Sequence, residues 1–151
     1  MGARVDIISD THGRLSPELM RAIKGADLVI HAGDLTSERN WRELKGATKR
    51  IEGVLGNNDY YYDYGPELQK LNVFTYEGLR FSVTHYREDL PLATSDVGVC
   101  GHTHRPVIER KGRCLIINPG SPTYPRSMRG PTIARIYVEA GTVISAKIID
   151  L

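Results

Sequence analysis

Short fragments scattered along the chain contain most of its histidines together with acidic and amide side chains that could bind metal ions. The fragments are Asp10-x-His12, Gly33-Asp34, Gly56-Asn57-Asn58-Asp59, His85 and Gly101-His102-Thr103-His104. Four of the five histidines belong to this set, and each fragment follows an apolar, strand-like run. Neutral imidazole, carboxylate and amide oxygen together favour two divalent transition metals over one structural zinc. The pattern therefore predicts a metal-assisted hydrolase.

Each fragment is weak evidence when it is taken alone. In an extended segment the side chains of Asp10 and His12 point the same way and can reach one ion, but an Asp that caps backbone amides would look the same. Gly33-Asp34 and Gly56–Asp59 are equally typical of turns. Five such fragments, each after an apolar run, are not expected from five independent turns. Together they favour a metal site.

The number of possible ligands indicates the kind of metal site. The seven groups are Asp10, His12, Asp34, Asn57, His85, His102 and His104. They are too many for one tetrahedral ion and suit two ions about 3.5–4 Å apart that share a carboxylate. Two carboxylates do not balance four positive charges, so the site would attract an anionic substrate such as a phosphate ester. A water molecule shared by the metals would be acidified into a nucleophilic hydroxide.

Composition and charge place the chain among ordinary globular proteins. Its 151 residues, 40% hydrophobic and 25% charged, predict a single domain over residues 1–151. A net charge of +2, spread along the chain, gives no sign of a nucleic-acid or membrane partner. Cys100 and Cys114 lie in apolar runs and predict buried thiols in a reducing compartment. With no leader-like start and no long apolar stretch, we expect a cytoplasmic protein.

The first half of the chain alternates strand and helix patterns. Strands are predicted over Arg4–Ile8, Leu28–Ile30 and Ile51–Leu55. Ser16-Pro17 is typical of a helix start, Gly25 of a helix end, and Ser37 begins a second helix. This alternation predicts a parallel sheet whose ligands lie beyond the carboxyl ends of its strands.

The second half is rich in strand patterns with few helix signals. Three hairpins are predicted, over Val73–Thr84, Val107–Ile117 and Ile133–Ile149, with a further strand over Val97–Cys100. We expect these elements to form a second, mixed sheet packed on the first.

The motifs and their order resemble those of the calcineurin-like metallophosphoesterases: D-x-H, G-D, G-N-x-D, a later His and G-H-x-H. The tail Asn118-Pro119-Gly120-Ser121, followed by Pro125-Arg126, is similar to the small YfcE-type phosphodiesterase branch, which also contains the retromer subunit. The resemblance implies an α/β fold, a four-layer αββα sandwich of two mixed β-sheets flanked by helices. It also implies a small phosphate ester as substrate, with the phosphodiester as the first expectation.

The resemblance implies a role for each ligand. One metal would take Asp10, His12, Asp34 and His104, and the other would take Asp34, Asn57, His85 and His102. Asp34 would bridge the two ions and, with His85 and Asn58, form the catalytic group. Manganese is the first expectation for both ions, with nickel, iron, cobalt or zinc as alternatives that the donor set does not separate.

The chain departs from the family pattern at two motifs. Many members have a His after the G-N pair that protonates the leaving group, whereas Asn58 can only donate a hydrogen bond to the substrate. This favours esters whose leaving group needs little protonation. The usual H-G-H is replaced by His85-Tyr86-Arg87, and Arg87 is either a phosphate ligand or a surface residue. The interval from His85 to His102 is short, which predicts a missing or truncated helix.

Several alternatives remain open from the sequence. His31 is expected to be structural, with a hydrogen bond to a metal ligand as the alternative. Asp59 is expected to hold a loop or a ligand, and the tyrosines at 60, 61, 62 and 64 to line the rim of the site or to pack in an interface. A phosphomonoesterase or nucleotide phosphatase and a non-catalytic scaffold like the retromer subunit are the competing functions, and a homodimer is possible. Scaffold members of the branch tend to lose ligand histidines, and this chain has all of them.

Overall fold

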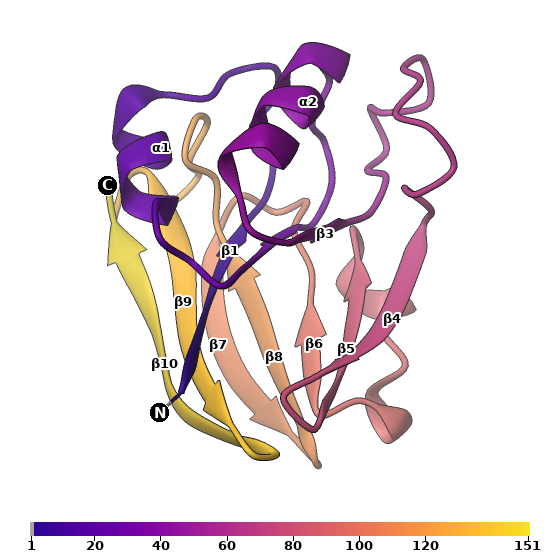
Figure 1. Ribbon diagram of the computed structural model, residues 1–151, viewed down its shortest axis with the longest axis vertical. Helices are drawn as coiled ribbons and strands as arrows, with labels where there is room; N and C mark the ends of the chain where they lie inside the picture. Colours follow the sequence, from indigo (N-terminus) through magenta and orange to yellow (C-terminus); the bar gives the residue numbers. More distant parts are fainter. Residues whose placement is uncertain (1) are drawn as a thin grey trace.

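Two five-stranded sheets pack face to face in the computed structural model, which describes residues 2–151 (Figure 1). The first sheet, in the order β10-β9-β1-β2-β3, contains β1 (Ala3–Ile8), β2 (Leu28–His31), β3 (Ile51–Gly53), β9 (Thr132–Glu139) and β10 (Thr142–Asp150). The second sheet, in the order β4-β5-β6-β8-β7, contains β4 (Leu71–Tyr76), β5 (Leu79–Thr84), β6 (Val97–Val99), β7 (Pro106–Lys111) and β8 (Cys114–Pro119). In the first sheet β1, β2 and β3 are parallel, and the β9–β10 hairpin adds antiparallel pairs beside β1. In the second sheet the parallel pairs lie inside and the antiparallel pairs at both edges, so both sheets are mixed, as predicted.

Alternation along the strands divides the apolar residues among three clusters. Val5 and Ile7 of β1 join Phe81 and Val83 of β5 in the main core between the sheets. Ile8 points the other way and joins the cluster beneath the helices. A third, smaller cluster lies on the outer face of the second sheet.

Two capped helices cover the outer face of the first sheet. They are α1 (Pro17–Ile23) and α2 (Glu38–Ala47). Ser16 Oγ accepts a hydrogen bond from the Leu19 amide at 3.1 Å, and Ser37 Oγ accepts one from Asn40 at 3.0 Å, so each serine satisfies an otherwise unpaired helix donor. Leu19 and Leu44 are among the apolar side chains that pack onto the sheet.

The layer over the second sheet is thin. It consists of two single 3₁₀ turns, η1 (Arg87–Asp89) and η2 (Leu92–Thr94), from which Leu90 and Leu92 pack on this face. The predicted four-layer arrangement of two mixed sheets is therefore confirmed, with its fourth layer reduced to these turns. The truncation expected from the short interval between His85 and His102 is also confirmed.

The third predicted hairpin was expected in the second sheet, and this prediction is wrong. The hairpin of β9 and β10 joins the first sheet, where β9 pairs with β1 in an antiparallel register that matches Val5 with Ile136. The strand pattern predicts the hairpin correctly but contains no information about which sheet edge it occupies. That choice follows from packing, because β9 buries Ile136 in the main core and Ile133 beneath the helices.

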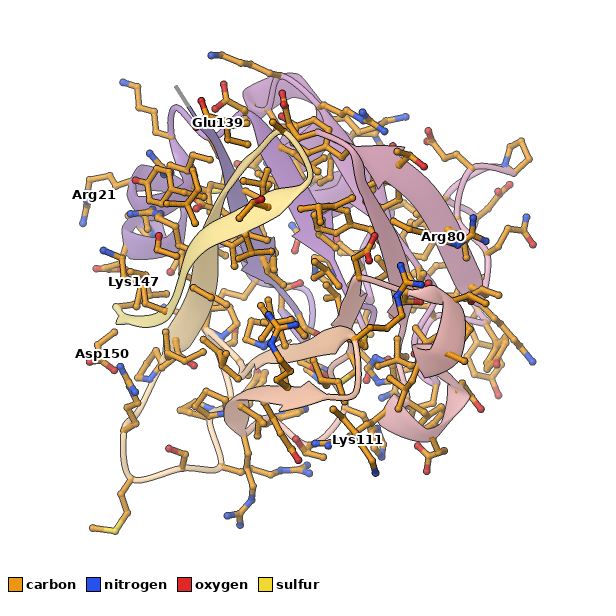
Figure 2. All side chains as sticks on the ribbon, turned by 90° about the horizontal axis from the view of Figure 1, so that it is seen from below. Arg21, Arg80, Lys111, Glu139, Lys147 and Asp150 are labelled. Carbon is orange, nitrogen blue, oxygen red and sulfur yellow. The ribbon has the colours of Figure 1, made fainter. Side chains whose placement is uncertain are left out.

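Charged side chains are distributed around the sandwich. Figure 2 shows Arg21 and Lys147 on one side of the molecule, Arg80 on the opposite side and Lys111 at a third place on its periphery, in agreement with solvated faces. Among residues 2–151 no helix has the length and apolar character needed to cross a membrane.

A buried carboxylate joins three elements of the first layer. Asp6 of β1 is fully buried and accepts hydrogen bonds from Arg4 at 2.7 and 3.2 Å and from Arg135 of β9 at 2.7 and 3.1 Å. Both guanidinium groups also donate to the Ala22 carbonyl of α1, at 2.7 and 2.8 Å. The cluster therefore holds β9 against β1 and α1 against both strands.

We expect Asp6→Ala to lower the free energy of unfolding by about 3 kcal/mol. This value is at the low end for a broken buried ion pair, because both arginines keep some contact with water. Urea denaturation followed by circular dichroism measures the change. Asp150→Ala is the matched control, since it breaks the exposed Arg129–Asp150 pair and should cost less than about 1 kcal/mol. Equal effects of the two variants would contradict the structural role of Asp6.

Candidate metal centre

The predicted ligands lie where the parallel strands of both sheets end. Asp10 and His12 follow β1, Asp34 follows β2, and Asn57 follows β3. His85 follows β5 and the pair at 102 and 104 follows β6. Backbone and side-chain hydrogen bonds join these ends, including His102 N–H to Asp10 Oδ2 at 3.0 Å across the two sheets. The carboxyl ends of the strands therefore form one ligand cluster, as expected for this kind of sheet.

Two overlapping groups of ligand atoms lie close enough to hold metal ions. Asp10, His12 and His104 form one group, and Asp10, Asp34 and His85 form the other. Within each group the ligand atoms lie within 4.8 Å of one another. Asp10 belongs to both groups.

Asp34 also lies between the two groups. Its Oδ2 atom is 3.6 Å from His12 Nε2 and 3.5 Å from His85 Nε2. This position between histidines from different sheets is suitable for a bridging carboxylate. The assignment of Asp34 as the bridge stays a prediction, because Asp10 is equally central.

Backbone carbonyls orient two of the imidazole rings. His85 Nδ1 donates to the Ala32 carbonyl at 2.7 Å, and His104 Nδ1 donates to the Tyr124 carbonyl at 2.6 Å. A neutral ring whose Nδ1 carries the proton presents the Nε2 lone pair to the cluster. Such carbonyl contacts are the usual way in which proteins fix the tautomer of metal-binding histidines.

The unbonded atoms of the cluster test whether a metal fits. Among the described residues, four buried side-chain atoms have no hydrogen-bond partner, and three of them are Asp10 Oδ1, Asn57 Oδ1 and His85 Nε2. Buried polar atoms without a partner are costly. All three carry lone pairs, and Asp10 Oδ1 lies 3.3 Å from His104 Nε2, which also presents a lone pair. A cation between these atoms removes the repulsion, so the residues fit divalent metal ions.

The electrostatics of the cluster favour ionised carboxylates. Burial alone would raise the pKa of Asp10 and of Asp34, but neighbouring histidines and, for Asp34, hydrogen bonds from Asn58 hold both pKa values below their ordinary range. The nearby Asp10 carboxylate raises the pKa of His104. Burial alone would lower the pKa of His85, but the nearby Asp34 and Asp10 carboxylates raise it. The cluster is thus anionic enough to attract cations.

The backbone at the ligands is strained. Five predicted ligands have a positive φ: Asp10 (56°), His12 (48°), Asp34 (62°), His102 (72°) and His104 (59°). They account for five of the eight non-glycine residues with this conformation among residues 2–151. Asp and His tolerate the left-handed region better than most residues, but the cost remains. Strain concentrated in this way is typical of functional sites.

Glycines allow the strand ends to approach one another. A Cβ on Gly56 would overlap the Asp34 carboxylate oxygen and lie 2.8 Å from its Cγ, and a Cβ on Gly101 would overlap Ser9 Oγ and lie 2.7 Å from Asp10 Oδ2. The G-N and G-H pairs therefore need glycine because a ligand from a neighbouring strand occupies the space of a side chain.

Asp59 organises the loop that carries Asn57 and Asn58. It is fully buried, and its carboxylate accepts backbone hydrogen bonds from Asp34 at 2.7 Å, Gly56 at 2.8 Å and Thr36 at 2.9 Å. Tyr64 Oη donates to it at 2.7 Å, and Tyr64 is buried. Asp59 was expected to hold a loop or a ligand. The structure shows that it holds the loop, and that it also holds the backbone at Asp34.

Asn58 is exposed, but its polar groups bond to the cluster. Its backbone N–H donates to Asp34 Oδ1 at 2.9 Å, and its Nδ2 donates to Asp34 Oδ2 at 2.9 Å. The side chain therefore orients the central carboxylate. Its predicted contact with substrate stays a prediction.

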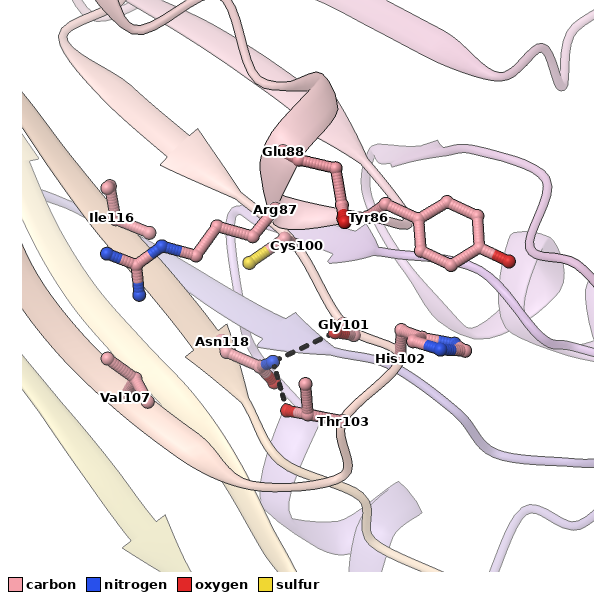
Figure 3. A pocket seen from close by; sticks show the side chains of 10 residues that line it. All are labelled: Tyr86, Arg87, Glu88, Cys100, Gly101, His102, Thr103, Val107, Ile116 and Asn118. Atoms are coloured by element: carbon pink, nitrogen blue, oxygen red, sulfur yellow. Dashed lines mark hydrogen bonds between the residues drawn. The ribbon is translucent and has the colours of Figure 1, made fainter.

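The other predicted site residues lie around the cluster. The His102 ring is 5.2 Å from that of His85, centroid to centroid. Arg87 is not brought to the cluster: its guanidinium bonds Glu109 at 2.7 Å and points away from His102 (Figure 3). Tyr60 lines a small cavity of about 90 Å³ with Asn57 and His85.

The remaining tyrosines differ in their surroundings. Tyr61 and Tyr62 are exposed, and the Tyr62 ring stacks on that of the buried Tyr64. The rim role predicted for this tract therefore has structural support at Tyr60, whereas Tyr64 belongs to the loop core.

His31 is a structural residue. It is fully buried, accepts the Gly33 N–H at its Nδ1 atom at 3.1 Å, and so presents Nε2–H to Thr11 Oγ1 at 2.9 Å. Burial lowers the pKa of His31 to about 4, which keeps the ring neutral. These bonds hold Thr11, which follows Asp10, and Gly33, which precedes Asp34.

Sequence reasoning missed three supporting residues. Ser9 Oγ donates to Asp10 Oδ2 at 2.6 Å, Ser121 Oγ donates to the Asp10 carbonyl at 2.8 Å, and Tyr124 holds His104 through its carbonyl. The Asn118–Ser121 motif was a signal for Ser121, but a backbone carbonyl such as that of Tyr124 leaves no trace in the sequence.

The mixed two-sheet sandwich and its Asp/His cluster define a metal-binding α/β protein. A family model described as the calcineurin-like phosphoesterase superfamily domain matches residues 4–141. A probable metallophosphoesterase of Methanothermobacter thermautotrophicus is 32% identical, with 96% of this chain and 91% of that protein covered. The chain belongs to the calcineurin-like phosphoesterase superfamily.

Solved structures agree with this membership. An archaeal phosphodiesterase superimposes with a TM-score of 0.77 at 26% identity, over 97% of this chain and 99% of the other. Vacuolar Protein Sorting 29 of Cryptosporidium parvum has a TM-score of 0.78 at 19% identity over 99% of both chains. YfcE, a phosphoesterase of E. coli, has 0.69 at 22% identity over 95% of this chain and 98% of that one. The last two show the shared fold, and the predicted membership of the calcineurin-like superfamily is confirmed by the family model and the relative.

We expect Gly56→Ala to weaken manganese binding about 10-fold or more, because the added methyl group displaces the Asp34 carboxylate. Calorimetric titration of the metal-free protein measures the affinity. Gly46→Ala in α2 is the control: a Cβ there meets no atom within 4 Å, so binding should be unchanged. Binding of manganese to Gly56→Ala with the affinity of the unmodified chain would contradict the close packing described above.

Proposed function

We propose that the protein is a dinuclear metal-dependent phosphodiesterase. The observation that carries the proposal is the set of unbonded, buried lone pairs on Asp10, Asn57 and His85, which come from three different strand ends. Asp10 and His85 belong to one group of ligand atoms, and Asn57 lines a small cavity with His85. The archaeal phosphodiesterase with the same fold supports the choice of a diester. Manganese is the first metal proposed, with nickel, iron, cobalt or zinc as alternatives, because oxygen and imidazole donors do not separate these ions.

The residues would divide between two ions as the family motifs imply. Asp10, His12, Asp34 and His104 would hold one, and Asp34, Asn57, His85 and His102 the other. When bound, such ions acidify a water molecule and neutralise charge on phosphoryl oxygens.

The contribution of the protein is mainly orientation. The carbonyls of Ala32 and Tyr124 aim the Nε2 atoms of His85 and His104 at the cluster. Asn58 holds the Asp34 carboxylate in a fixed plane through two hydrogen bonds. Preorganised ligands of this kind do not need to reorganise during the reaction.

Substrate preference follows from the groups around the cluster. Asn58 occupies the motif position of a general acid but has no titratable proton near neutral pH. Leaving groups that depart as stable anions are therefore proposed to react faster than alkoxides, which need a proton.

We expect Asp34→Asn and His85→Ala to lower turnover of bis(p-nitrophenyl) phosphate with manganese by at least about 1,000-fold, because each removes a ligand on which the reactive metals depend. Release of p-nitrophenolate measures the rate. Asp150→Asn, which changes an exposed carboxylate far along the chain, should keep full activity. Substantial turnover by either ligand variant would rule out the mechanism.

Chelation followed by dialysis should abolish hydrolysis, and titration with manganese should restore it. A panel of phosphodiesters and phosphomonoesters with the same p-nitrophenolate leaving group then compares kcat/KM. We expect kcat/KM for the diester to exceed kcat/KM for the monoester. A preference for the monoester would favour the phosphatase function, and hydrolysis that survives complete metal removal would refute metal dependence.

A further inference from the structure

A cavity of about 450 Å³ opens on the outer face of the second sheet, beside the metal cluster (Figure 3). Its lining includes Tyr86, Arg87, Cys100, His102, Val107 and Ile116. The cavity exists because only the turns η1 and η2 cover this face. Its volume is within the range of small-molecule sites.

The interior of this cavity is apolar and carries no free cation. Ile116 and Cys100 form its buried floor. The Arg87 guanidinium is paired with Glu109 at 2.7 Å, and the exposed Glu88 adds a negative charge at the rim. An anion would be unfavourable here.

The polar groups of the floor are already satisfied. Asn118 Nδ2 donates to the Gly101 carbonyl and to Thr103 Oγ1, both at 3.0 Å (Figure 3). Asn118 Oδ1 accepts the Gly120 N–H at 3.0 Å. An occupant therefore gains little from hydrogen bonding and most from burial of apolar surface.

Tyr86 connects the cavity to the metal cluster. Its ring lies 4.6 Å from the His102 ring and 5.4 Å from the His85 ring, centroid to centroid. It also lines the small cavity that contains Asn57 and His85. A phosphoryl group at the ligands would thus lie next to an aromatic wall, and its organic substituent would enter the larger cavity past Tyr86 and His102.

We propose that this cavity is the subsite for an uncharged aromatic substituent of the phosphate ester. The proposal rests on the proposed function in one respect, that the phosphoryl group binds at the metal cluster. It adds the substrate class: aryl-type esters in preference to small alkyl esters.

Calorimetric titration of the manganese-loaded protein with phenylphosphonate and methylphosphonate tests the subsite without any turnover. The unmodified chain should bind phenylphosphonate at least about 10-fold more tightly, because the ring leaves water. Val107→Trp fills the cavity from β7 and should bring phenylphosphonate to the affinity of methylphosphonate, with methylphosphonate unchanged. Ile144→Trp on the exposed surface of β10 is the control and should keep the full preference.

Equal affinities of the two phosphonates for the unmodified chain would overturn the subsite, and so would a full preference in Val107→Trp. The comparison in the unmodified chain needs no variant, so it decides the proposal even if Val107→Trp fails to fold. An aromatic preference without hydrolysis of any ester would support the subsite and refute the phosphodiesterase. Hydrolysis without an aromatic preference would support the phosphodiesterase and refute the subsite.

Discussion

Compensation of the negative charge on two buried carboxylates is the constraint on which the site depends. Asp10 and Asp34 share one group of ligand atoms within 4.8 Å with His85, where two like charges without cations would be unfavourable. Hydrogen bonds from Ser9, Asn58 and backbone amides offset part of this repulsion. Divalent ions would offset the remaining repulsion between the carboxylates. For this reason the cluster is well suited to metals.

The fold supplies the rigidity that this arrangement needs. Strand ends from both sheets carry the ligands, and the main core holds the two sheets together behind them. Left-handed backbone at Asp10, Asp34 and His102 costs stability. Asp59 offsets part of this cost because its buried carboxylate accepts hydrogen bonds from four backbone amides and from the Tyr64 hydroxyl.

The two outer faces of the sandwich differ, and the difference bears on the substrate. Two capped helices seal the first sheet, whereas single 3₁₀ turns cover the second. The thin layer leaves the cavity beside His102, with Tyr86 between the cavity and the ligands. A short segment between two ligand motifs thus determines the size of the space beside His102.

The sequence by itself determined the elements and the identity of the ligand-bearing fragments. Strand alternation, the Ser16-Pro17 and Ser37 helix starts, and polar fragments after apolar runs are local signals that need no partner to be recognised. The predicted hairpin over Val73–Thr84 ends at the residue where β5 ends. The short interval after His85 likewise predicted the reduced helical layer.

Only the tertiary structure decided which elements meet. It placed the β9–β10 hairpin on the edge of β1, paired Arg87 with Glu109, turned Asn58 onto Asp34, and brought the Tyr124 carbonyl to His104. The physical reason is that these contacts join residues far apart in the chain. The local sequence does not distinguish one sheet edge or one bonding partner from another, so the packing of the whole chain selects between them. Residue types define what a site can bind, whereas long-range packing defines where each group points.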